Sequence, residues 1–201
     1  ISKSGKIYNL VSENKRAWHA GKCYWGGVTD INSSSIGIEL DYPASNKNQK
    51  FSNELIISLM NLLKKIVKKY KISPNNVLGH SDIAPYRKID PGQNFPWYKI
   101  EKKQLSFYIK KIKNKTFLKY LLKKWYLKNK FNSQKKIILF MLNYIGYDVS
   151  LAIKNNLCFD QLILNYRNHF KFYKNNYYNN KYIFKVIELH FLNILLTKLK
   201  K

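Results

Sequence analysis

Apolar and polar positions follow two different periods in the first half of the chain. Residues 35–42 (SIGIELDY) alternate between apolar side chains and small or polar ones, and this period of two predicts a β-strand. From Ser52 to Lys71 the spacing becomes helical, with one apolar stripe and lysines on the opposite face. Ser52 is the expected N-cap of this helix, and Phe51 and Ile56 are spaced for a hydrophobic staple.

Two shorter segments are expected to complete an α/β domain. The segment GKIYNLV (5–11) predicts a strand after a glycine turn, and SPNNVLG (73–79) predicts a turn followed by a short strand. The order strand, strand, helix, strand is typical of the α/β class.

The second half of the chain has helical spacing only. Helices are expected over about 133–144, 160–170 and 182–198, and Gly146 is a suitable residue to end the first of them. Three short helices around one core predict a small three-helix domain.

The composition changes near residue 99. Seven of the eight glycines and all five prolines lie before it, whereas the net charge rises from +7 over 1–98 to +19 over 99–201. We therefore predict a first domain over 1–98, a basic linker or helical connection over 99–130, and the helical domain over 131–201. The apolar runs are too short to span a bilayer, so no transmembrane segment is expected.

The net charge of +26 suggests an anionic partner, but the types of basic residue that produce this charge argue against nucleic acid. Only three of the 37 basic residues are arginines, the side chain expected for bidentate recognition of bases and phosphates. Abundant Lys, Asn, Ile and Tyr also follow from A/T-rich codons without selection for DNA. We expect no specific nucleic-acid binding, and an anionic polymer such as a cell wall fits the charge equally well.

The most varied stretch is GHSDIAPYRKIDPG, residues 79–92. Lys88 and Asp90 are two apart, so in an extended segment their side chains point the same way, and the loop returns toward His80. Imidazole and carboxylate are a natural pair for Zn²⁺, and a lysine beside them would neutralise an oxyanion. The alternative is a structural histidine followed by an ordinary Asp-Pro-Gly turn.

Glu39 is a candidate general base in the predicted strand 35–42. Its face is shared by Gly37 and Asp41, which suggests a lined cleft in which a carboxylate could move a proton. The alternative is a glutamate that faces solvent on an antiparallel strand.

Four pieces of the first half occur together in one known family. They are AWHAG, SIGIEL, GHSDIAPYRKIDPG and FPW, in this order, and over residues 1–98 the chain resembles the zinc-dependent N-acetylmuramoyl-L-alanine amidases of the peptidoglycan recognition protein superfamily. The resemblance implies the amidase fold, a mixed central sheet flanked by helices. It implies Zn²⁺ as cofactor and peptidoglycan or muropeptides as partners. We expect the chain to be a monomer.

The resemblance also implies roles for individual residues. His80 and Asp90 correspond to zinc ligands, Glu39 to the catalytic acid/base and Lys88 to the residue that stabilises the transition state. Three further positions fall in stretches that line the glycopeptide cleft of relatives: His19, Trp25 and Asn32.

One expected element is missing from the pattern. Relatives have a third zinc ligand, a histidine just before the stretch that corresponds to residues 1–10, and the first histidine here is His19 in the separate WHAG motif. An N-terminally truncated copy is the simplest interpretation, and a decayed amidase is the rival.

The second half resembles the C-terminal helical domain of the envelope amidases in this family, on the pieces LNYIGYDVS (142–150) and LILNYRNHFKF (162–172). That domain is similar to small peptidoglycan-binding modules, and a purely structural appendage is the alternative. The likeness favours the periplasmic side of the outer membrane, with the cytoplasm as the alternative. His169 and His190 lie on apolar helical faces and are expected to pack in the core or in the cleft rather than to bind a metal.

The predicted function is a zinc-dependent hydrolase that cleaves the amide bond between N-acetylmuramic acid and L-alanine. The alternative is a non-catalytic peptidoglycan-binding protein with an incomplete zinc site.

Overall fold

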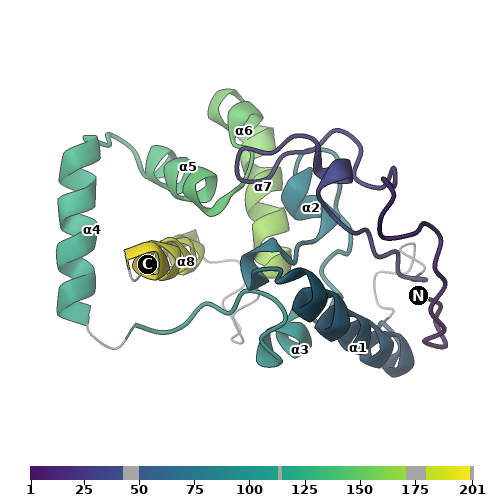
Figure 1. Ribbon diagram of the computed structural model, residues 1–201. Helices are drawn as coiled ribbons and strands as arrows, with labels where there is room; N and C mark the ends of the chain where they lie inside the picture. Colours follow the sequence, from purple (N-terminus) through teal and green to yellow (C-terminus); the bar gives the residue numbers. More distant parts are fainter. Residues whose placement is uncertain (43–49, 113–114, 171–179, 200–201) are drawn as a thin grey trace.

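The computed structural model describes residues 1–42, 50–112, 115–170 and 180–199, and helices dominate these ranges (Figure 1). In chain order the helices are η1 (Ile31–Ser33), α1 (Asn53–Tyr70), η2 (Pro74–Asn76), α2 (His80–Ile83), α3 (Trp97–Lys102), α4 (Lys115–Asn129), α5 (Gln134–Ile145), α6 (Ser150–Lys154), α7 (Asn156–His169) and α8 (Asn180–Leu199). None of the described helices combines the length and apolarity needed to cross a membrane.

Helix α1 forms where the sequence predicts it. The Ser52 hydroxyl accepts a hydrogen bond from the Leu55 amide at 3.2 Å, which satisfies one of the free N–H groups of the first turn. At the other end Lys71 adopts a left-handed conformation that stops the helix. The apolar stripe of α1 packs against Phe95 and Trp97 in one buried cluster.

The predicted sheet is absent, so the α/β class with its mixed central sheet is wrong for this structure. Within the described ranges the backbone forms one isolated bridge, between Trp25 and Val28, and no sheet. The segment 5–11 pairs with no strand among the residues that the structure describes, and Leu10 is 80% exposed. The short strand expected before His80 is also absent, because the chain turns directly into α2.

The segment 35–42 keeps its alternating pattern without becoming a strand. Ile38 and Leu40 pack against the cluster of α1, while Glu39 faces solvent. The backbone of this segment bonds to Ile1, whose amine donates to the Glu39 carbonyl at 2.7 Å and whose carbonyl accepts from the Asp41 amide at 2.9 Å. A period of two fixes which side chains are buried, but a sheet also needs a continuous ladder to a neighbour.

The second half contains the three predicted helices as α5, α7 and α8. It also contains α4, which lies in the predicted linker, and the short α6, so the described part of this half has more than three helices. Helices α5 and α8 pack against each other around a core that includes Met141, Leu142 and Ile187, while α4 lies along the outer edge (Figure 1).

The two halves of the chain meet at Trp25. Its ring packs edge-on against Tyr147 with the ring centres 5.0 Å apart, and the next amide, of Gly26, donates to the Gly146 carbonyl at 2.8 Å. A Cβ atom on Gly146 would lie 2.8 Å from the Trp25 ring, so a glycine is required for this approach.

We expect Gly146→Ala to destabilise the fold more than Gly27→Ala. Both glycines have positive φ, +140° and +97°, but only Gly146 has a neighbour in the way. The shared backbone strain costs roughly 1–2 kcal/mol, and the clash with Trp25 adds about 1–3 kcal/mol at Gly146. Urea unfolding of the two variants measures the difference, and equal losses would contradict the close packing at Trp25.

Candidate active site

The site begins where two parts of residues 79–92 come together. A Cβ atom on Gly79 would lie 2.7 Å from the Pro91 ring, so the absence of a side chain lets these two backbones approach. Beside this contact the Ser81 amide donates to the Asp90 carbonyl at 2.9 Å. The first turn of α2 is therefore held against the end of the loop, and His80 is brought beside Asp90.

His80 and Asp90 form a direct pair. The His80 Nδ1 atom lies 3.1 Å from Asp90 Oδ2, and its Nε2 atom lies 3.1 Å from the Ala20 carbonyl. The hydrogen bond to His80 lowers the pKa of the Asp90 carboxyl below its ordinary value, and the charge of Lys88 acts in the same direction. The structure thus brings together both predicted zinc ligands and places the charge of Lys88 within electrostatic reach.

The stretch around His19 borders this pair. The side-chain oxygen of Asn32 accepts from the amides of His19 and Ala20 at 3.0 and 2.8 Å. This bend presents the Ala20 carbonyl to His80, and the Arg87 guanidinium donates to the same carbonyl at 2.8 Å. Asn32 is buried, so its observed role is to hold the bend.

The segment that carries Glu39 lies beside the stretch around His19. The His19 ring lies against Gly37, where a Cβ atom would come within 2.6 Å of it, and His19 Nε2 lies 3.2 Å from the Ser35 hydroxyl. The segment that carries Glu39 therefore runs beside the His19 stretch, while the Glu39 side chain itself is exposed.

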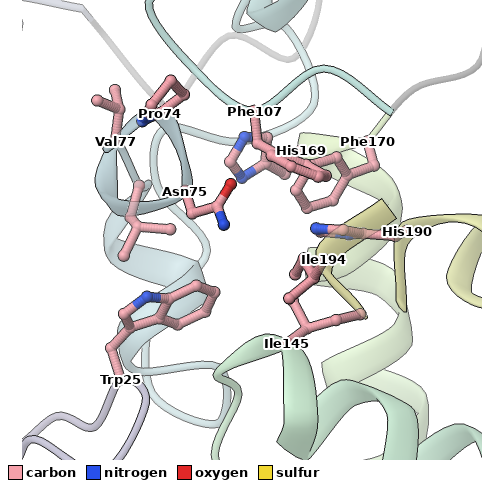
Figure 2. Close-up of a pocket in the computed structure, with 11 residues that line it drawn as sticks. Trp25, Pro74, Asn75, Val77, Phe107, Ile145, His169, Phe170, His190 and Ile194 are labelled. Atoms are coloured by element: carbon pink, nitrogen blue, oxygen red, sulfur yellow. The ribbon is translucent and has the colours of Figure 1, made fainter. Parts of the chain in front are cut away.

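Trp25, a predicted cleft residue, lies at the junction between the halves of the chain. It lines a small cavity whose other walls include Asn75, His169 and His190 (Figure 2). Because its ring packs on Tyr147, the contacts of Trp25 in this structure join the two halves.

Asp82 is a central residue that the sequence reasoning missed. Its carboxylate is fully buried and accepts from the Gly79 amide at 2.7 Å and from the Tyr147 hydroxyl at 2.6 Å. The same carboxylate lies 2.7 Å from His169 Nδ1. Tyr147 and His169 are 65 and 87 residues away from Asp82 in the sequence, so no local pattern could have identified these two partners.

The two histidines of the second half pack as expected from their apolar faces. His169 and His190 are each 2% exposed. The His169 ring stacks between Trp97 and Phe170, and His190 Nδ1 lies 3.0 Å from the Tyr166 hydroxyl. Burial lowers the pKa of His190 well below its ordinary value, which keeps its ring neutral.

The described residues include side chains of the types that bind zinc, but fewer of them than a catalytic zinc site needs. One imidazole and one carboxylate meet at His80 and Asp90, and both are ordinary zinc ligands. A catalytic zinc ion takes three protein ligands, and in the described part of the chain no three His, Cys, Asp or Glu side chains are grouped to hold a metal ion.

Residues 1–93 match the model of the N-acetylmuramoyl-L-alanine amidase family. The match covers a little less than half of the chain. Over 101 residues, 47% of this chain, it is 44% identical to N-acetylmuramoyl-L-alanine amidase AmiD of Escherichia coli, of which it covers 37%. Over 98 residues, 48% of this chain, it is 43% identical to 1,6-anhydro-N-acetylmuramyl-L-alanine amidase AmpD of Haemophilus influenzae, of which it covers 52%. The chain thus spans about a third to a half of these relatives.

The structural likeness extends further along the chain than the family match. The complex of AmiD from E. coli with anhydro-N-acetylmuramic acid-L-Ala-D-γ-Glu-L-Lys superposes with a TM-score of 0.73 and 29% identity, over 94% of this chain and 73% of that one. AmpDh3 from Pseudomonas aeruginosa in complex with anhydromuramic pentapeptide gives 0.73 and 26%, over 95% and 74%. The likeness therefore includes the helical second half.

We expect His80→Ala to raise the pKa of Asp90 toward its ordinary value, because the hydrogen bond to His80 is the largest cause of its depression. The depressed pKa means that the pair stabilises the fold at neutral pH, and that this contribution is lost as the pH falls through the folded-state pKa. Carboxyl NMR titration of the metal-free chain measures the shift. His19→Ala is the control, and an unchanged Asp90 pKa in His80→Ala would contradict the pairing.

Proposed function

We propose that this chain is a zinc-dependent amidase that cleaves the bond between the lactyl group of N-acetylmuramic acid and the L-alanine of a muropeptide. The observation that carries the proposal is the His80–Asp90 pair, held at 3.1 Å within the segment that matches the amidase family. The two solved relatives are complexes with anhydromuramic peptides, and these ligands support a soluble muropeptide as substrate.

His80 and Asp90 are the proposed zinc ligands in the described chain. Bound zinc would supply a water molecule that is acidic enough to give hydroxide near neutral pH. The depressed pKa of Asp90 keeps its carboxylate charged and ready to bind a cation. The Ala20 carbonyl, on the other side of the ring, fixes the orientation of His80.

Lys88 and Glu39 are proposed to act on charge and protons. The Lys88 ammonium stabilises the negative oxygen that develops when the amide carbonyl is attacked. The exposed Glu39 carboxylate takes the proton of the attacking water and returns it to the leaving amine of L-alanine. His19 and Asn32 are proposed to line the muropeptide cleft at the bend that Asn32 holds at His19 and Ala20.

A second candidate function is muropeptide binding without cleavage. The observation in its favour is the small donor set, since the described residues bring together two zinc ligands where catalysis calls for three. Incubation with anhydro-muropeptide and chromatography of the products separates the two functions. A free peptide that begins with L-alanine supports the amidase, and binding without this product supports the alternative.

We expect Glu39→Gln to abolish most of the cleavage while zinc binding is retained. The amide is nearly the same size but cannot accept the proton, and loss of a general acid/base costs roughly 10²–10⁴-fold in rate. Glu54→Gln, an exposed glutamate in the first turn of α1, removes the same charge elsewhere and should keep its activity. Turnover near the wild-type level in Glu39→Gln would remove Glu39 from the mechanism.

We expect Asp90→Ala to impair zinc binding and Lys88→Ala to impair the chemical step. Asp90→Ala removes a ligand and should weaken zinc binding. Lys88→Ala should keep zinc but lower kcat by roughly 10²–10³-fold, because only the charge of the transition state is affected. Zinc titration and muropeptide chromatography of both variants give the two readouts. Full zinc binding in both, with similar rates, would show that the assignment is wrong.

A further inference from the structure

Helix α7 is fastened to the loop that carries Lys88 and Asp90. The side-chain amide of Asn165 donates to the Pro85 carbonyl at 2.7 Å and to the Lys88 carbonyl at 3.0 Å. Asn165 is fully buried; its bond to Pro85 is shielded from water, and its bond to Lys88 is partly shielded. One side chain of the second half therefore fixes both ends of a short turn next to the candidate zinc ligand Asp90.

Two further contacts fasten the same region. The Asp82 carboxylate, two residues after His80, binds Tyr147 and His169 of the second half. The Tyr86 hydroxyl donates to the Asp148 carbonyl at 2.7 Å. Figure 1 shows the result, with α2 lying directly beside α7.

Apolar packing alone would hold two helical layers together without such directional bonds. Here buried polar groups of the second half are satisfied by the backbone and side chains that flank His80 and Lys88. Hydrogen bonds behind metal ligands set the orientation of those ligands, and their loss typically costs 10–100-fold in metal affinity.

We propose that the helical second half positions the amidase site, and that Asn165 is the positioning residue that sets the backbone between Pro85 and Lys88. The expected effect on zinc binding by His80 and Asp90 rests on the proposed function. It gives the second half a role in the chemistry that does not depend on any contact between its helices and the substrate.

The test replaces Asn165 by Asp or by Leu in the full chain. Asn165→Asp directs an acceptor at two carbonyl oxygens, and Asn165→Leu keeps the volume but removes both donors. In both variants we expect amide hydrogen exchange at Ser81, which is bonded to the Asp90 carbonyl, and at Lys88 to rise about tenfold or more. Zinc affinity, measured by titration with the metal alone, should fall by roughly 10–100-fold.

The matched control is Asn193→Asp. Asn193 of α8 also donates its side-chain amide to two backbone carbonyls, of Lys110 at 3.0 Å and Leu189 at 2.7 Å, and these contacts lie within the second half. Its loss should lower thermal stability while exchange at Ser81 and zinc affinity stay at wild-type values. If Asn193→Asp weakens zinc binding as much as Asn165→Asp does, the effect is general destabilisation and the inference fails.

The two readouts separate the inference from the proposed function. If the wild-type chain shows no zinc binding that depends on His80, the proposed function is wrong, but exchange at Ser81 and Lys88 still decides whether Asn165 orders the loop. Unchanged exchange in both Asn165 variants would overturn the inference. Faster exchange with unchanged zinc affinity in a zinc-binding chain would also overturn it, because the loop would then be ordered without effect on the site.

Discussion

The arrangement of the molecule depends on the buried carboxylate of Asp82. A carboxylate removed from water is costly unless its oxygens are satisfied, and here the backbone amide of Gly79, the Tyr147 hydroxyl and the His169 ring surround it. One of these partners belongs to the first half and two to the second. Neither half alone can satisfy the charge, so burial of Asp82 requires the two halves to dock. The burial of Tyr147 and its nearness to Asp82 raise the pKa of that phenol well above its ordinary value, which keeps it protonated as a donor.

This docking explains the geometry of the site two residues away. With α2 anchored through Asp82, the close approach of Gly79 and Pro91 brings Asp90 beside His80. The bend held by Asn32 then adds the Ala20 carbonyl on the other side of the imidazole ring. The pair is thus the product of three separate supports, each made of backbone or buried polar groups rather than of flexible surface side chains.

The sequence predicted those features that depend on local spacing. Helix α1 and its Ser52 cap follow from an apolar stripe and one hydroxyl, and the end of α5 follows from Gly146. The meeting of His80 and Asp90 was also predicted, since both lie in one short loop. The alternation predicted a sheet that the described residues do not form, because Ile38 and Leu40 are buried against α1 without a neighbouring strand.

The remaining features depend on partners that are far apart in the chain. Nothing near Asn165 in the sequence distinguishes it from the other asparagines of a chain rich in them, and its role appears only when the carbonyls of Pro85 and Lys88 are in place.

The dependence on a few distant contacts also accounts for the uneven likeness to relatives, with 44% identity to AmiD over 101 residues but 29% over the 94% of the chain that superposes. Helix packing tolerates many apolar exchanges of similar volume, so the second half can keep its shape while its sequence changes. The few polar side chains that contact the loop cannot be exchanged as freely. A hydrogen bond to a carbonyl in a fixed position needs a side chain of the right length that places its donor at that point.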